Sequence, residues 1–257
     1  MPENGLRAKL SARAIIRPVV RPLATAGLRA AFSVADPVSV GWWGAALASE
    51  PDRVAAELSR RLGSLIPPTP AEVVGNYVRG LLLSGRAAGP GERNGFEWSA
   101  FPRRAIITPE TAKVPKRLRP IQRHTDLEVR YNEDFEAIIR QCRARHGGGW
   151  ITPELIDVYC AMDRWGFTGT VATYRDGKPV GGLWGVGIGR AFSILSMFHT
   201  ENHAGALALA ALSDSLRQGG PWSVVDCVEL NPNFARYGFS EIPAGKFAEL
   251  VLDGLTG

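Results

Sequence analysis

The chain has 257 residues, of which 45% are hydrophobic and 21% are charged, and its formal net charge is +5. These values predict a globular protein with one large domain or two modest ones, and they exclude a largely disordered chain. No window approaches the ~18 consecutive apolar residues that cross a bilayer, so no membrane span is expected. The three cysteines are widely spaced. They offer neither a disulfide framework nor a Cys-x-x-Cys metal clip, which favours the reducing cytoplasm.

The positive charge gathers in two segments. In residues 1–35, arginine and lysine recur against the single acid Glu3. This segment lacks the continuous apolar core of a secretory signal, so we interpret it as a basic helical extension. Residues 103–123 are also strongly basic, with Glu110 as the only acid. Prolines interrupt this second run, which predicts an exposed basic loop suited to a polyanion. The alternative is a solvated positive face without a partner.

Local signals predict two helices in the first part of the chain. Residues 51–63 place apolar side chains at helical spacing. After Pro67 and Pro68, Thr69 can cap a second helix and Glu72 closes a capping box, so this helix is expected to run to about residue 83. The Gly-, Pro- and Arg-rich residues 84–95 predict a loop.

We therefore expect a domain boundary near residue 90. The predicted units are a basic extension (1–35), a small, mainly helical N-terminal domain (36–90) and a larger domain (91–257).

The second half of the chain predicts a mixed α/β domain. Its expected elements are helices at 133–145 and 153–165, a hairpin with strands 168–174 and 179–186, a strand at 191–198, a helix at 202–217, a strand at 223–230 and a helix at 245–253. The Asp176-Gly177 pair predicts the hairpin turn. This order resembles the N-acetyltransferase-like (GNAT) plan, an acyltransferase domain in which helices flank a mixed sheet.

Several motifs occur together in a fixed order. They are Tyr77-Val78-Arg79-Gly80, Trp98-Ser99-Ala100-Phe101-Pro102-Arg103-Arg104, Gly149-Trp150-Ile151-Thr152, Gly181-Gly182-Leu183-Trp184-Gly185, Ser196-Met197-Phe198, Asp226-Cys227, Leu230-Asn231 and Glu241-Ile242-Pro243. In order and spacing the series resembles the leucyl/phenylalanyl-tRNA–protein transferase family over roughly residues 70–250. The resemblance implies transfer of leucine or phenylalanine from aminoacyl-tRNA to an N-terminal lysine or arginine, which marks the acceptor protein for degradation.

The implied chemistry needs little catalytic machinery. An aminoacyl ester is already activated, so an enzyme must position the ester and an amine and stabilise the developing charge. No cofactor and no covalent nucleophile are expected, because aminoacyl-tRNA is itself the co-substrate. By resemblance, Asp226 and Asn231 hold the catalytic positions, with Asp226 orienting the α-amine or accepting its proton. The alternative for Asp226 is a strand-end aspartate that binds local backbone.

The resemblance also implies binding residues for the donor. Residues matching the acyl pocket are Leu183, Phe192, Met197, Leu209, Leu216 and Val225. Residues matching contacts to the terminal adenosine and the rest of the tRNA are Tyr77, Trp150, Tyr159, Arg103, Lys113, Lys116, Arg117, Arg119 and Arg123. Aromatic side chains stack on bases and cations bind phosphates. The apolar and aromatic residues are equally consistent with ordinary core.

The sequence departs from the family pattern at the acceptor side. Leu195 replaces a glutamate and Val228 replaces a glutamine two residues after Asp226. Because residues 223–230 are expected to form one strand, residues 226 and 228 point to the same face, and Glu229, on the other face, cannot stand in for the lost amide. The family's hairpin histidine is replaced in the Gly169-Thr170 region, and its aromatic run by residues 81–84. We therefore expect that donor binding is retained and acceptor recognition is rebuilt.

Two other functions remain open. A coenzyme A-dependent acyltransferase needs a Gly-rich pyrophosphate loop after the central strand, and residues 199–207 lack that pattern. A catalytically silent paralogue that binds tRNA or protein would explain the lost polar residues.

His199 and His203 have helical ligand spacing but no evident third ligand, so no metal site is predicted. A monomer is expected.

Overall fold

The computed structural model describes residues 67–89 and 94–256, so the basic extension and the predicted helix at 51–63 lie outside the described residues. Its centre is a seven-stranded sheet in the order β4-β5-β6-β7-β8-β3-β9. The strands are β3 (Arg103–Ile107), β4 (Glu128–Tyr131), β5 (Thr168–Arg175), β6 (Lys178–Ile188), β7 (Ala191–His199), β8 (Val224–Asp226) and β9 (Ser240–Pro243). β7 and β8 run parallel, whereas the other neighbours are antiparallel. The predicted mixed sheet is therefore confirmed.

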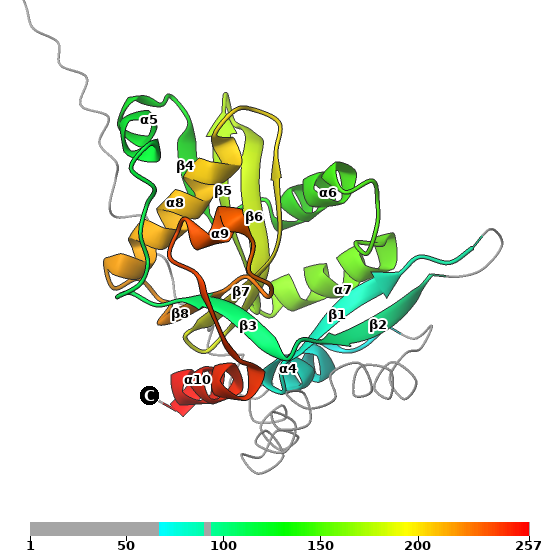
Figure 1. Cartoon of the computed structure of the whole chain (residues 1–257). Helices are drawn as coiled ribbons and strands as arrows, with labels where there is room; N and C mark the ends of the chain where they lie inside the picture. Colours follow the sequence, from blue (N-terminus) through cyan, green and yellow to red (C-terminus); the bar gives the residue numbers. More distant parts are fainter. Residues whose placement is uncertain (1–66, 90–93, 257) are drawn as a thin grey trace, which may run out of the picture.

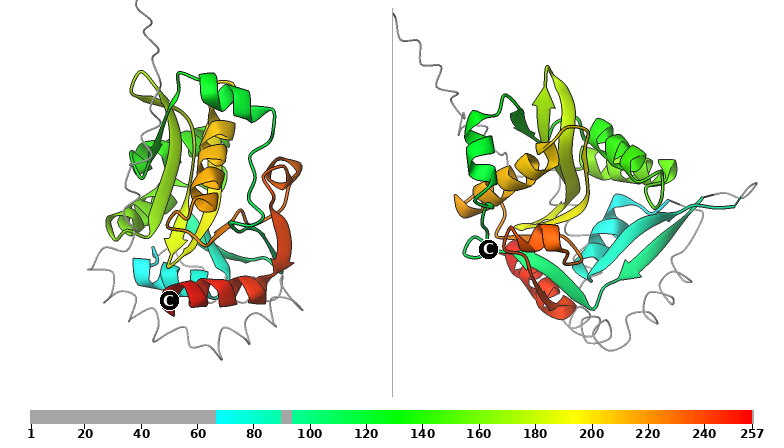
Figure 2. Two further views of the ribbon diagram at one scale, coloured as in Figure 1. Left: turned by 90° about the vertical axis from the view of Figure 1, so that its left-hand side faces the viewer. Right: turned by 45° about the horizontal axis from the view of Figure 1, so that its top comes forward.

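Helices cover both faces of this sheet (Figure 1). One face carries α8 (Ala204–Arg217), and the other carries α6 (Phe135–Arg145) and α7 (Pro153–Arg164). α4 (Pro70–Val78) and α10 (Ala244–Thr256) pack together at one end of the sheet, as Figure 2 also shows. The first core cluster joins the sheet to α4, α6, α7 and α10, and the second joins it to α8. No helix among the described residues is long and apolar enough to span a bilayer.

Where local signals are strong, the predicted elements are confirmed. Thr69 and Glu72 form the capping box of α4, and the Thr152 side chain caps α7. In the hairpin between β5 and β6, Asp176 and Gly177 have φ values of 49° and 73°. Two successive positive φ values are typical of the type I′ turn that an Asp-Gly pair favours. β7, α6, α8 and α10 also lie where the sequence predicts them, within a few residues.

The prediction for residues 79–95 is wrong. α4 ends at Val78, Gly80 adopts a φ of 84°, and β1 (Leu81–Arg86) begins directly afterwards. β1 pairs antiparallel with β2 (Gly95–Ala100), so much of the expected loop is a second, two-stranded sheet. The leucines of β1 and the aromatic side chains of β2 are buried in the first core cluster. Leucine suits helices and strands alike, and tertiary burial decides between them here. This hairpin bridges the predicted domain boundary near residue 90, and the division into domains stays a prediction.

The expected basic loop at 103–123 is also wrong in part. Residues 103–107 form β3 and residues 118–124 form α5 (Leu118–His124), which leaves only the central residues as loop. The strand predicted at 223–230 ends at Asp226, and α9 (Pro232–Ala235) follows shortly afterwards. β4, β9, α5 and α9 are elements that were not predicted from the sequence.

Candidate functional site

The candidate site lies where β7 and β8 separate. The two strands pair only from Ala191 opposite Val224 to Ser193 opposite Asp226, although β7 continues to His199. Among the described residues, no other strand pairs with this side of β7 beyond Ser193. The pairing of β6 with β7 also shifts by one residue at Leu195, which forms a β-bulge. Bulges and unpaired strand edges are common next to active sites.

Asp226 ends β8 beside this opening and is wholly buried. Its carboxylate forms a two-pronged ion pair with Arg104, which is itself 0% exposed. Arg104 Nε donates to Asp226 Oδ1 at 3.1 Å, and Nη2 donates to Oδ2. The backbone N–H of Val228 also donates to Asp226 Oδ1, at 3.0 Å. These three hydrogen bonds occupy most of the acceptor sites of the carboxylate.

The backbone turns sharply after Asp226. Val228 has a φ of 67°, a left-handed conformation that is rare for β-branched residues. Such strain costs about 1–3 kcal/mol and persists only where surrounding contacts impose it. β3 supplies two of these contacts, because Ala105 N donates to Val228 O and Cys227 N donates to Ala105 O. The expected strand alternation of residues 226 and 228 is therefore wrong, since the strand ends before Val228.

Asn231 lies at the N-terminus of α9 and is exposed. Its Oδ1 accepts hydrogen bonds from the backbone N–H groups of Asn233 at 2.9 Å and Phe234 at 3.1 Å. This arrangement is a helix N-cap. The structure thus places Asn231 beyond the turn that follows Asp226, with its side-chain oxygen bound to local backbone.

The predicted adenosine-binding aromatic residues gather on the face covered by α6 and α7. Tyr77 and Tyr159 are buried, with their hydroxyls 3.4 Å apart, and Tyr159 Oη donates to the backbone oxygen of Leu83 at 3.0 Å. Burial raises the pKa of both tyrosines above its ordinary value. Trp150 is half-buried and stacks on Trp184, with ring centroids 6.2 Å apart. Of the three predicted aromatic residues, Trp150 therefore has the most surface open to a base.

The β1–β2 hairpin lies directly against this aromatic group. Gly85 N donates to Trp150 O at 2.8 Å, and a Cβ on Gly85 would approach Thr152 Oγ1 to 2.5 Å. Residues 81–84, where we expect the family's aromatic run to be replaced, thus lie in a strand packed beside Trp150. Ser84, in that strand, donates its hydroxyl to Glu97 O.

The predicted acyl-pocket residues lie together on the opposite face of the sheet. Leu183, Phe192, Leu209, Leu216 and Val225 belong to the second core cluster, and Met197 packs against it. Because neighbouring residues of a strand point to opposite faces, Val225 faces α8 while Asp226 faces away from it. The structure brings the predicted acyl-pocket residues together but separates them from the Asp226 side chain by the sheet.

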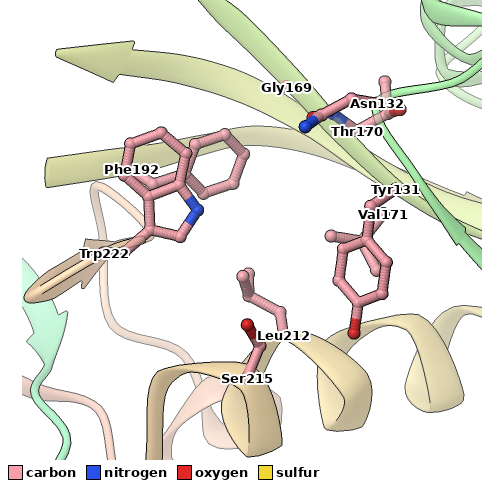
Figure 3. Close-up of a pocket in the computed structure, with 9 residues that line it drawn as sticks. All are labelled: Tyr131, Asn132, Gly169, Thr170, Val171, Phe192, Leu212, Ser215 and Trp222. Carbon is pink, nitrogen blue, oxygen red and sulfur yellow. The ribbon is translucent and has the colours of Figure 1, made fainter. Parts of the chain in front are cut away.

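A small pocket lies at the α8 face beside this cluster (Figure 3). Phe192 and Trp222 stack at one side with ring centroids 5.2 Å apart, and Leu212 and Ser215 rise from α8. Its cavity volume is about 10 Å³, which is about the space of one water molecule. Phe192 is the predicted acyl-pocket residue that lines it. A Cβ on Gly187 would approach the Trp222 ring to 2.5 Å, so this ring lies against the backbone of β6.

The predicted phosphate-binding cations form a surface on α5 and the loop before it. Lys113, Lys116, Arg117, Arg119 and Arg123 are exposed and form no ion pair among the residues that the structure describes. α5 is held to α8 by Gln122, which donates to Asp214 at 2.9 Å. Arg103 differs from the other cations, because it is paired with Glu241 at 3.0 Å. The five unpaired cations form the stronger candidate for a polyanion surface.

The two positions where we expect a family glutamate and glutamine to be replaced carry partly buried apolar side chains. Leu195, at the bulge, and Val228, in the turn, are half-buried and pack against the first core cluster. Within the described chain there is no group of three potential metal ligands, and His199 and His203 are both exposed.

Sequence reasoning missed Arg104 and Trp222. Arg104 was grouped with the exposed basic run, although its alternation with Ile106 within a short apolar strand was an available signal. Its partner lies 122 positions away in the chain, which no local pattern reveals. Trp222 follows a Gly-Gly-Pro turn and carried no motif that marked it as a pocket residue.

Comparison with known proteins identifies related sequences. The family model described as leucyl/phenylalanyl-tRNA protein transferase matches residues 106–252. Proteins of that name include one from Rubrobacter xylanophilus, 36% identical over 188 residues that cover 73% of this chain and 95% of the relative. One from Burkholderia cenocepacia is 34% identical and covers 71% of this chain and 72% of the relative. The match with the Azoarcus sp. protein, at 36% identity, covers 58% of this chain and 64% of the relative, less than two thirds of its length.

Among solved structures, a GCN5-related N-acetyltransferase from Kribbella flavida aligns with a TM-score of 0.35 and 14% identity. It covers 66% of this chain and 59% of the other. A likeness at this level carries no functional information.

Proposed function

Since the chain belongs to the leucyl/phenylalanyl-tRNA–protein transferase family, we propose that it moves an apolar aminoacyl group from aminoacyl-tRNA to an amine. The observation that carries this proposal is the match to the Rubrobacter xylanophilus protein over 95% of that protein's length. The acyl group is leucyl or phenylalanyl, as the name of that relative states.

The donor side is supported by two surfaces of the described chain. The unpaired cations of α5 and its preceding loop would bind phosphates of the tRNA, a contact that positions the ligand and weakens with salt. The apolar residues between the sheet and α8 would receive the acyl side chain. The small pocket at Phe192 and Trp222 must widen to admit a leucyl group, because its present volume is about that of one water.

The reaction itself is a simple acyl transfer. The lone pair of a neutral amine attacks the ester carbon, a C–N bond forms and the C–O bond to the terminal ribose breaks. The amine loses one proton and the departing ribose oxygen gains one, so no other reactant is consumed. Holding the ester and the amine in the correct relative position supplies much of the rate enhancement. The opening between β7 and β8 is the proposed place where the two substrates are held.

The residues at the acceptor side of the site favour a peptide acceptor whose first residue is uncharged. A lysine or arginine side chain held at this site would need a free acid. Leu195 and Val228 are apolar, and the Asp226 carboxylate is already paired with Arg104. We propose that the acceptor is the α-amine of a peptide whose first side chain carries no positive charge.

We also propose that the protein acts as a monomer in the cytoplasm, where charged tRNA is found. Light scattering after gel filtration tests its mass.

Single-turnover transfer tests the proposal. Purified protein is mixed with leucyl-, phenylalanyl- or aspartyl-tRNA and with peptides that begin with leucine, serine, lysine or arginine, using an N-acetylated peptide as the negative control. Transfer of leucine or phenylalanine, and not aspartate, to an unblocked peptide is expected. Salt-dependent tRNA binding without transfer to any acceptor would contradict the enzymatic proposal and favour a non-catalytic tRNA-binding protein.

A further inference from the structure

Arg104 joins four parts of the fold that surround Asp226. From β3, its guanidinium pairs with Asp226 of β8, and its Nη1 lies 3.5 Å from the backbone oxygen of Gly80, between α4 and β1. On another side, the guanidinium carbon lies 4.4 Å from the centre of the Phe247 ring of α10. A buried arginine with this set of partners has little freedom to move.

The same contacts fix the turn that borders the opening. Asp226 Oδ1 receives both Arg104 Nε and the Val228 N–H, so the guanidinium holds the carboxylate in the orientation that captures this amide. The residue after Arg104 binds the turn through its backbone, since Ala105 exchanges hydrogen bonds with Cys227 and Val228. Removal of the guanidinium would free the carboxylate and release one of the contacts that keep Val228 in its left-handed conformation.

We propose that Arg104 is a positioning residue, and that the Arg104–Asp226 pair shapes the acceptor wall at Val228 instead of supplying Asp226 as a proton acceptor. The acceptor wall is Val228, two residues after the end of β8, and Leu195, in the part of β7 that β8 does not pair, so both positions border the opening. Their position would set how the acceptor amine approaches the ester. The expected effect on the acceptor KM rests on the proposed aminoacyl transfer. The expected effect on the Val228 turn can be measured without any substrate.

Four variants separate positioning from proton transfer. Arg104→Lys keeps the charge but loses the two-pronged geometry, and Asp226→Asn keeps an oxygen for the Val228 N–H but loses the charge. The double variant Arg104→Gln with Asp226→Asn replaces the ion pair by two neutral amides that can still bond to each other, so it avoids a lone buried charge. Arg175→Gln is the control, because Arg175 is also an ion-paired arginine, with Asp126 and Glu201 as its partners, but lies at the end of β5.

For a positioning pair, both single variants raise the acceptor KM by up to about 100-fold while the Kd for tRNA stays unchanged. The pH profile of transfer keeps its shape, and the double variant recovers part of the activity lost in Asp226→Asn. If Asp226 is instead the proton acceptor, Asp226→Asn removes the acidic limb of the pH profile of transfer. The double variant is then no more active than Asp226→Asn alone. That result would overturn the inference, even though wild-type transfer would still support the proposed function.

Amide hydrogen exchange gives the second measurement, without substrate. The Val228 amide is expected to exchange slowly in the wild type and in Arg175→Gln, and at least tenfold faster in Arg104→Lys. Unchanged protection of Val228 in folded Arg104→Lys would show that the guanidinium does not hold the turn, and would refute the inference whether or not the wild type transfers an aminoacyl group.

Discussion

The hydroxyls of Tyr77 and Tyr159 lie 3.4 Å apart between α4 and α7, and Tyr159 also donates to the backbone oxygen of Leu83 in β1. This pair therefore links both helices to the first strand of the hairpin. Tyr159→Phe leaves a buried carbonyl unpaired, so we expect a loss of about 1–3 kcal/mol in the free energy of unfolding. Urea denaturation measures it. Tyr77→Phe is the control and should cost less, and equal losses would contradict the assigned role of Tyr159.

The unpaired cations should control the salt dependence of tRNA binding. Lys116→Ala and Arg117→Ala should each lower the slope of log K against log salt by about 0.7 to 0.9, because each removes about one phosphate contact. Filter binding over a range of salt concentrations measures this slope. Arg103→Ala should change it less, since Arg103 is already paired with Glu241. An unchanged slope in both loop variants would exclude this surface as the RNA contact.

Restoring polar groups at the acceptor wall should change which peptides are used. Leu195→Glu places a carboxylate at the half-buried bulge, where it can pair with a cationic acceptor. A hydrogen bond to a charged group contributes about 1.5–3 kcal/mol, so transfer to peptides beginning with lysine or arginine should rise about ten- to hundredfold relative to leucine-starting peptides. Competition between the two peptides measures the ratio. Leu195→Gln is the uncharged control, and an equal gain with it would contradict charge pairing.

Two glycines should respond to alanine in opposite ways. Gly85 faces Thr152 and the Trp150 carbonyl, so a Cβ there has no space and the hairpin must move away from α7. Gly75, within α4, has nothing within 4 Å of its Cβ position. Gly75→Ala should therefore stabilise the protein by about 0.5–1 kcal/mol, whereas Gly85→Ala should destabilise it. Thermal unfolding compares the two, and a stable Gly85→Ala protein would show that the hairpin is not tightly docked.

Buried tyrosines should make the protein sensitive to alkali. Burial raises the pKa of Tyr131 and of Tyr237 to about 12, from an ordinary value of 10.0. Below about pH 10 both tyrosines are protonated in the folded and in the unfolded state, and their contribution to the free energy of unfolding is fully present. Between about pH 10 and 12 they ionise first in the unfolded chain, so the free energy of unfolding falls. Urea unfolding at about pH 9 and about pH 11 measures the loss. Tyr237→Phe should make the decline shallower, and an identical decline would exclude Tyr237 as a contributor.

Elements with local signals could be predicted from the sequence, and those decided by distant contacts could not. The Thr69 cap and the Asp176-Gly177 turn depend on neighbouring residues, and both are confirmed. The strand at Leu81 could not be distinguished from a continuing helix, because its pairing partner lies in β2, beyond a Gly- and Pro-rich connection.

The site divides in the same way. The apolar side chains of β6, β7 and α8 could be expected to meet, because their spacing places them on one face. The pairing of Arg104 with Asp226 and the left-handed backbone of Val228 could not be foreseen, since the first joins residues 122 positions apart and the second opposes the preference of a β-branched residue. Local propensity mispredicts the burial and backbone conformation of residues that depend on contacts with distant parts of the chain.

The contact between Gly187 and Trp222 means that the Trp222 ring, which lines one side of the pocket, is backed by the main chain of β6. Side chains can rotate to admit a bulkier ligand, but a strand inside a sheet cannot yield without disturbing its neighbours. Enlargement on the Trp222 side is therefore blocked, and it must come from the α8 side, where Leu212 and Ser215 line the pocket. The size limit for the acyl group would then depend on how far α8 can shift from the sheet, so natural variation in donor preference should be found along that helix.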